Sequence, residues 1–257
     1  MEVFVICFTA LAASILTFFS GFGLGTILGP VMMLYFPIEV AIAMTGVVHF
    51  ANNIFKLLLT AKKANWQIIL RFGLPAIIAA WIGAWILIHM GDIEPLFSYR
   101  IGEKTYEIHT IKLIIAILLM FFAVVELQPY FGKLEFNKDK LPIGGFLSGF
   151  FGGLTGSQGA LRSAFLIRAG MSKEAFVGTT VIISTMVDIT RLGVYAEGMY
   201  KNMEQIDMTT LFLAIIFAIT GAILGNFWIK KVTLLFIQRT VAIALIIIAL
   251  GLGAGIL

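Results

Sequence analysis

Two glycine-rich segments carry most of the residues that could bind a ligand. The first, 20–26, reads Ser-Gly-Phe-Gly-Leu-Gly-Thr, and the second, 148–159, reads Ser-Gly-Phe-Phe-Gly-Gly-Leu-Thr-Gly-Ser-Gln-Gly. Each interrupts a long apolar run, which predicts a helix break followed by a half-helix. The start of such a half-helix presents unpaired N–H groups and the positive end of its dipole, which favour a small anion. The candidate substrate-binding residues in these segments are Gly23, Gly25, Thr26, Gly153, Thr155, Gly156, Ser157 and Gln158. The alternative is that the small residues serve only close helix packing.

Ionisable residues inside the apolar runs form a second group of candidates, because such residues are costly in a membrane and usually functional. Arg162 lies about one turn into the second half-helix and suits bidentate contacts with an oxyanion, so it joins the substrate-binding candidates. Snorkelling, or pairing with Asp188, is an equal alternative for it. Asp188 and Arg191 can pair on one helix face. His49 could relay protons, although an interhelical hydrogen bond is the favoured interpretation. His49, Asp188 and Arg191 are therefore candidates for coupling or for an ion pair.

Amides and hydroxyls complete the candidate polar pathway. Asn52 and Asn53 lie a turn before Lys56, and we interpret both as substrate-binding residues on its wall. Hydroxyl residues run along the matching helix of the second half at positions 179, 180, 184 and 185. Lys56 and Arg191 lie within two turns of their helix ends, so we expect both to snorkel rather than to contact a ligand.

Metal and cofactor chemistry find no support in the sequence. No Cys/His cluster has zinc spacing, and the single Cys7 excludes an intramolecular disulfide. We expect no cofactor, no metal and no enzymatic activity. A remote alternative is an intramembrane enzyme with Ser157 as nucleophile, but the sequence offers it only the distant His49 and no recognisable third group.

Composition places these residues in a membrane protein. Hydrophobic residues make up 60% of the 257 positions and charged residues 12%, with a mean hydropathy of +1.02. A soluble domain carries about a quarter charged residues. The lipid bilayer is therefore an expected partner, and no basic-aromatic surface suggests nucleic acid.

Apolar runs predict the elements that position the candidates: an all-α polytopic membrane protein with a broken or re-entrant helical hairpin and three transmembrane helices in each half. The first half, 1–127, has a hairpin at 3–36 and spans at 38–60, 67–90 and 110–127. A cytoplasmic linker follows at 128–140. The second half, 141–257, has a hairpin at 141–170 and spans at 174–196, 208–228 and 235–256.

Polar residues recur at matching places in the two halves, which predicts an internal repeat. A shift of 128 residues aligns Ser20-Gly21-Phe22 with 148–150, and a shift of 135 aligns Asn53 with Asp188 and Lys56 with Arg191. Because lysines and arginines favour the cytoplasmic side, the basic loops predict hairpins of opposite orientation, two inverted repeats and both termini outside. Eight complete spans are the alternative, but they would place Arg168 and Lys173 outside.

The glycine segments resemble the two signatures of the sulfite exporter TauE/SafE family, also called the 4-toluene sulfonate uptake permease family. The segment 175–180 (Ala-Phe-Val-Gly-Thr-Thr) and the segment 221–225 (Gly-Ala-Ile-Leu-Gly) are similar to it as well. This resemblance implies a duplicated permease in the cytoplasmic cell membrane of a prokaryote that moves small organosulfur or inorganic sulfur anions. It implies that the hairpins form the translocation core. The second copy departs from the family pattern at Gln158 and Arg162.

These observations predict a secondary transporter for a small sulfur-containing oxyanion, such as sulfite, a sulfonate or sulfoacetate, working by alternating access. An anion channel or a non-transporting membrane subunit is the alternative, since channels also line polar paths with broken helices. The chain could also form a homo-oligomer.

Overall fold

The structure is a computed structural model that describes residues 1–18, 23–90, 94–128, 138–166, 169–228 and 234–256. Several sequence predictions therefore lie outside the described residues. They concern Ser20, Gly21 and Phe22 of the first glycine segment, most of the linker at 128–140, Arg168, and the basic pair Lys230 and Lys231.

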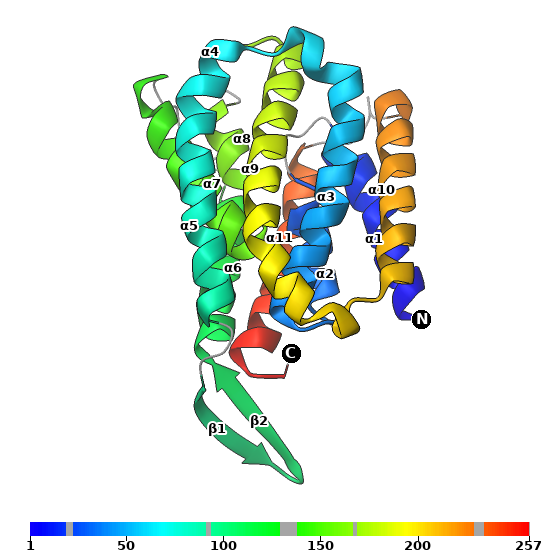
Figure 1. The fold of residues 1–257 in the computed structure, drawn as a ribbon, viewed down its shortest axis with the longest axis vertical. Coiled ribbons are helices and arrows are strands. Elements are labelled where there is room, and N and C mark those ends of the chain that lie inside the picture. The colour runs from blue at the N-terminus through cyan, green and yellow to red at the C-terminus, as the bar shows by residue number, and fades with distance from the viewer. Residues whose placement is uncertain (19–22, 91–93, 129–137, 167–168, 229–233, 257) are drawn as a thin grey trace.

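The described chain is mostly helical (Figure 1). Helices of the first half are α1 (Glu2–Thr17), α2 (Gly25–Met32), α3 (Ile38–Thr60), α4 (Trp66–Ile68), α5 (Leu74–Met90) and α6 (Thr110–Leu127). Helices of the second half are α7 (Leu141–Thr155), α8 (Gly159–Leu166), α9 (Lys173–Lys201), α10 (Met208–Trp228) and α11 (Leu234–Gly253). A π-helical turn (Ile69–Gly73) joins α4 to α5, and 3-10 turns occupy Ala61–Lys63, Lys138–Lys140 and Met203–Gln205.

Four segments are long and apolar enough to cross a membrane: Ile38–Lys63, Trp66–Met90, Lys173–Tyr200 and Met208–Phe227. Shorter apolar helices occupy Glu2–Thr17, Thr110–Val125, Leu141–Thr155 and Ala242–Gly253 within the described residues. The 29 residues of α9 extend over about 43 Å, more than the roughly 30 Å of a bilayer core. The chain therefore has the features of a multi-pass membrane protein.

The expectation of a purely α-helical chain is wrong between α5 and α6. There, β1 (Pro95–Ile101) pairs antiparallel with β2 (Lys104–His109), and Gly102 occupies the turn at φ +62°. This β-hairpin projects below the helices in Figure 1. Tyr99 and Tyr106 stack across the pair, and the Tyr99 hydroxyl donates to the carbonyl of Ala254. These contacts tie the hairpin to the end of α11.

Helices of one half pack mainly against helices of the other half. The most extensive contacts between helices are α5 with α7, α1 with α10, α6 with α11 and α3 with α9. In Figure 1, α4 marks the upper end of the molecule, whereas the β-hairpin and both termini lie at the lower end. The ends of α7 and α8 meet near the upper end, since Leu141 and Leu166 share one cluster with Ile68 and Phe72 of the α4–α5 segment.

Glycines allow α7 to lie directly on α5. A Cβ atom on Gly145, Gly149 or Gly153 would lie 2.0–2.1 Å from the carbonyl oxygen of Phe72, Ala76 or Ala80, respectively. This spacing of four places the three glycines on one face of α7. In the matching contact of α1 with α10, a Cβ on Gly221 would lie 2.5 Å from the Leu11 carbonyl oxygen. Much of the glycine content of the second segment therefore serves close packing.

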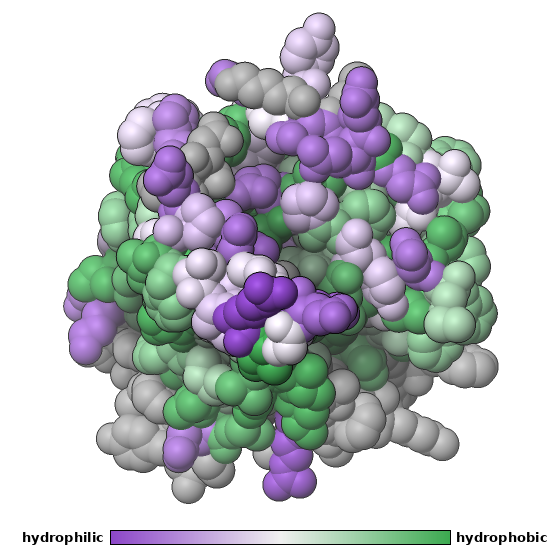
Figure 2. Space-filling model, turned by 90° about the horizontal axis from the view of Figure 1, so that it is seen from below, coloured by the Kyte–Doolittle hydropathy of each residue, from purple (hydrophilic) through white to green (hydrophobic). Residues whose placement is uncertain are grey.

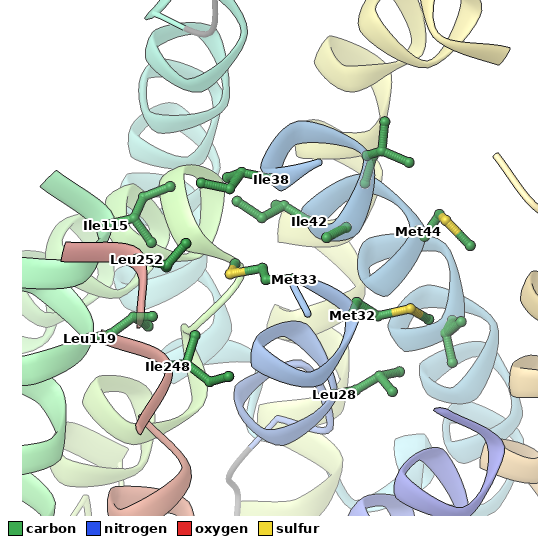
Figure 3. Close-up of a cluster of buried hydrophobic side chains, with 14 of the residues drawn as sticks. Leu28, Met32, Met33, Ile38, Ile42, Met44, Ile115, Leu119, Ile248 and Leu252 are labelled. Atoms are coloured by element: carbon green, nitrogen blue, oxygen red, sulfur yellow. The ribbon is translucent and has the colours of Figure 1, made fainter. Parts of the chain in front are cut away.

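Hydrophobic side chains fill the space around α2, as Figure 3 shows. Leu28 and Met32 of α2 are fully buried in a cluster that also contains Ile42 of α3, Leu119 of α6 and Ile248 of α11. Because α2 is short, this packing rather than its own hydrogen bonds holds it in place.

Large hydrophobic side chains also cover the outside of the helices. They include Phe4, Leu58, Ile78, Phe212 and Ile247, whose side chains are 61–78% exposed. Seen from the lower end in Figure 2, hydrophilic side chains gather across the middle and upper part of the face, and hydrophobic ones dominate its sides. Apolar flanks with a polar end are the surface that a bilayer requires.

Candidate functional site

Three polar residues lie on one face of α3. His49, Asn53 and Lys56 are spaced at i, i+4 and i+7, which places them above one another on a helix. All three are buried, with relative exposures of 3–4%. Since α3 packs against α9, this face points toward the second half of the chain.

Asp188 of α9 connects these residues to the rest of the site. Its Oδ2 lies 2.7 Å from His49 Nδ1 and accepts a hydrogen bond from Asn53 Nδ2 at 2.8 Å. Its Oδ1 accepts from Arg191 Nε at 3.0 Å, lies 2.8 Å from Arg191 Nη2 and lies 3.5 Å from Gln158 Nε2. The interhelical hydrogen bond of His49 and the pairing of Asp188 with Arg191 are therefore confirmed, and the two occur in one network.

The turn between α7 and α8 attaches to the same network. Gly156 ends α7 in the left-handed conformation, at φ +77°, which favours glycine. Arg191 Nη1 donates to the Gly152 carbonyl at 3.4 Å, and the Tyr195 hydroxyl donates to the Gly153 carbonyl. Side chains of α9 therefore hold this turn through its backbone carbonyls.

The two glycine segments approach each other in the interior. A Cβ atom on Gly25 would lie 3.1 Å from the carbonyl oxygen of Gly156. A Cβ on Gly23 would lie 3.0 Å from Nε2 of His49. Glycine at these positions lets the first segment lie against both the second segment and α3.

A small cavity lies beside this junction. Its volume is about 20 Å³, room for about one water molecule. The lining residues come from the end of α1, the first glycine segment, α3, α8 and α9: Thr17, Phe18, Gly23, Leu24, His49, Asn53, Lys56, Arg162, Thr180, Val181 and Ser184.

The charge around the cavity is predominantly positive. Lys56, Arg162 and Arg191 are 0–4% exposed, and Asp188 is the single carboxylate among the buried residues of the described chain. Arg191 pairs with Asp188 and does not line the cavity, whereas Lys56 and Arg162 do. Two cationic side chains on the wall of one small cavity suit an anion there.

The expectation that Lys56 and Arg191 snorkel is wrong for both residues, because both are buried instead of reaching the membrane surface. The Lys56 ammonium lies 5.3 Å from the centre of the Phe18 ring. With its amide oriented to satisfy both atoms, Asn52 donates to Ser14 Oγ and accepts from Lys56 Nζ, each at 3.2 Å. The position of Lys56, seven residues after His49, is the sequence signal that could have assigned it to the same helix face.

Two backbone donors near the starts of the half-helices are already used. The N–H of Thr26 donates to the Gly23 carbonyl at 3.1 Å, and that of Ser157 donates to Thr155 Oγ1 at 3.2 Å. The sequence predicted that N–H groups at the starts of the half-helices form the site. In the structure, cationic and hydroxyl side chains supply more of the cavity wall than these helix termini.

The sequence candidates thus divide into two groups. The structure brings Gly23, His49, Asn53 and Arg162 together at the cavity. The remaining candidates do not line it: Gly25, Thr26, Asn52, Gly153, Thr155, Gly156, Ser157, Gln158, Asp188 and Arg191. Thr26 Oγ1, Ser157 Oγ and Gln158 Oε1 are buried and have no hydrogen-bond partner among the residues that the structure describes. Within the part of the chain that the structure describes, no group of three His, Cys, Asp or Glu side chains could hold a metal ion.

Comparison with known proteins identifies the family. A search of proteins of curated function found no match. The family model described as sulfite exporter TauE/SafE matches residues 6–252, which is essentially the whole chain, including both glycine segments and every residue of the cavity. The chain belongs to the sulfite exporter TauE/SafE family.

Proposed function

We propose that this protein is a secondary transporter that carries a small sulfur-containing oxyanion, such as sulfite, a sulfonate or sulfoacetate, by alternating access. Membership of the family implies a membrane transporter of sulfur anions. The observation that carries the proposal is the small cavity, lined by buried residues, whose wall includes both Lys56 and Arg162. A guanidinium and an ammonium group on one cavity wall suit the oxygens of a compact anion.

The wall also carries neutral polar groups that fit such an anion. Ser184 of α9 and the amide of Asn53 line the cavity. Thr180 lies one turn before Ser184 and lines it as well, although its hydroxyl donates to the Val177 carbonyl. The volume of about 20 Å³ leaves room for little more than one water molecule, so a bound oxyanion requires the hairpins or α9 to move. Such a motion is what alternating access supplies.

Two inverted repeats, each with a re-entrant hairpin, belong to the same proposal. The mirrored contacts support it: α1 packs on α10 as α7 packs on α5, and the pairs α3 with α9 and α6 with α11 join equivalent helices. Gly83 and Gly221, which a shift of 138 residues aligns, also lie in equivalent contacts, against α7 and α1. Hairpins entering from opposite sides would meet at the midplane, where transporters of this plan bind substrate.

The orientation follows from the positive charges of the loops. Lys62, Lys63 and Arg71 flank the α4 end, whereas Glu94, Glu103 and Asp207 lie toward the end with the β-hairpin. We assign the α4 end to the cytoplasm, which places both termini outside a prokaryotic cell membrane.

Transport by purified protein in proteoliposomes tests the proposal. Radiolabelled sulfite, thiosulfate, sulfate and methanesulfonate are offered separately, and saturable, trans-stimulated flux of at least one anion is expected. Flux that neither saturates nor responds to anion on the far side would mean a channel, and absence of both flux and binding for every anion would refute the proposal.

Three variants that each remove one positive charge locate the site. Lys56→Met and Arg162→Met should each weaken anion binding by about tenfold or more, because each removes a charge-assisted contact worth about 1.5–3 kcal/mol. Lys62→Met removes an equal charge from an exposed position and should leave affinity within about twofold. Equal affinities for all three variants would show that the anion binds elsewhere.

A further inference from the structure

The His49 ring presents its two nitrogens to different surroundings. Nδ1 lies 2.7 Å from Asp188 Oδ2, and a carboxylate only accepts hydrogen bonds, so Nδ1 carries the proton. The hydrogen-bond contacts of the described residues to this ring all go to Nδ1. Nε2 faces the backbone of Gly23, and His49 lines the cavity. A neutral His49 therefore keeps a proton-accepting nitrogen in the interior of the site.

We propose that His49 takes up a proton on Nε2 when an anion enters the cavity, so that the anion and the proton bind together. This inference rests on the proposed function and names a coupling ion for it. The proton comes from a hydronium ion or a buffer acid in the aqueous phase, which loses it as a new N–H bond forms at Nε2. The ring becomes a cation with two donors. Nδ1 continues to donate to Asp188, and Nε2–H donates to an oxygen of the anion.

The charges facing His49 explain why the two ligands would depend on each other. Asp188 and Arg191 come from α9, Lys56 from α3 and Arg162 from α8. Arg191 offsets the carboxylate of Asp188, so Lys56 and Arg162 repel an added positive charge in the empty cavity. An anion at Lys56 and Arg162 reduces that repulsion and accepts from the new donor.

Linkage makes this effect reciprocal. If the anion raises the proton affinity of His49, then a proton on His49 raises the anion affinity by the same factor. A dianion offsets more of the repulsion than a monoanion, so it should be bound with more proton uptake. When the anion leaves on the other side of the membrane, His49 returns its proton to water there. Anion and proton would thus cross in the same direction.

Calorimetry on the purified full chain tests the inference. Sulfate and methanesulfonate are titrated in Bis-Tris and in imidazole, which have different ionisation enthalpies and carry no sulfonate group that would compete. We expect proton uptake of up to about one proton per anion, greater with sulfate than with methanesulfonate. Sulfate affinity should accordingly rise as the pH falls through the range in which His49 titrates.

Three variants assign the proton. His49→Asn keeps a donor toward Asp188 and removes Nε2. Anion binding should therefore weaken, and at anion concentrations that restore it the proton uptake should be close to zero. The matched control is His89→Asn, which removes an exposed histidine on α5 and should take up as many protons as the wild type. Lys56→Met tests the other titratable group on the cavity wall and should retain proton uptake at anion concentrations that restore binding.

Each outcome decides the inference. Unchanged uptake in His49→Asn, or loss of uptake only in Lys56→Met, would overturn it while leaving the transporter proposal intact. Anion binding to the wild type without proton uptake would overturn it in the same way. If His49→Asn does not fold, the pH dependence of wild-type affinity decides, and affinity independent of pH would count against it. Failure of the wild type to bind any of the anions would remove both proposals.

Discussion

Replacing Asp188 by asparagine should destabilise the protein more than any other change of similar size. The four groups around its carboxylate, on His49, Asn53, Arg191 and Gln158, all present donors. The new amide nitrogen would have to face one of them, and the guanidinium of Arg191 would lose its buried counter-charge. Removing one partner of a buried ion pair costs about 3–5 kcal/mol.

A double-mutant cycle separates the charge from the shape of the side chain. Asp188→Asn combined with Arg191→Met removes both charges, and replacement of a whole buried pair is often close to neutral. We therefore expect the double variant to recover at least about 1 kcal/mol relative to Asp188→Asn alone. The free energy of unfolding would be measured by SDS titration in mixed micelles, followed by tryptophan fluorescence. A loss below about 1 kcal/mol in Asp188→Asn, or a double variant as unstable as the single one, would refute the proposed role of the pair.

Two further predictions concern packing and a helix end. Gly149→Ala should destabilise by about 1–3 kcal/mol because its Cβ would lie 2.0 Å from the backbone carbonyl of Ala76. Gly193→Ala has nothing within 4 Å of its Cβ and should be neutral or slightly stabilising; similar unfolding energies in the same SDS titration would contradict the packing account. Asp207→Ala should cost about 1 kcal/mol, because the carboxylate accepts from the N–H groups of Thr209 and Thr210 at the start of α10. The hydroxyl and N–H of Thr210 lower the pKa of Asp207, so its stabilisation is present above the pKa of the unfolded chain and is lost as the pH falls through the lower folded value. Unfolding midpoints of wild type and variant should therefore converge on acidification, and a constant difference would contradict this assignment.

Helix-forming segments were largely predictable, since they depend on local patterns. Apolar runs bounded by polar residues predicted helices, and the glycine breaks separated α1 from α2 and α7 from α8. The β-hairpin was not predicted, because its two strands are short and lie outside the long apolar runs. Its sequence signal was a short alternating pattern around Tyr99 and Tyr106 with Gly102 at the turn.

Burial of charge was less predictable than helix position. Lys56 lies close enough to the end of α3 to suggest snorkelling, yet the surrounding segments cover it. Distance from a helix end is a local measure, whereas exposure depends on which elements pack there. The glycines of α7 are a second example. The sequence predicted a helix break from them, with close packing as the alternative, whereas in the structure they also allow the close contact with α5.

The sequence by itself determined that this is a multi-pass membrane protein and which polar residues lie inside its apolar runs, because hydropathy and spacing are properties of the local chain. Tertiary structure alone decided which of those residues meet. His49 and Asp188 are 139 residues apart, and only the packing of α3 on α9 brings them to 2.7 Å. The same packing, with both glycine segments pressed against it, places Lys56 and Arg162 on one cavity. Such contacts depend on the pairing of helices distant in the chain, which periodicity within one helix does not specify.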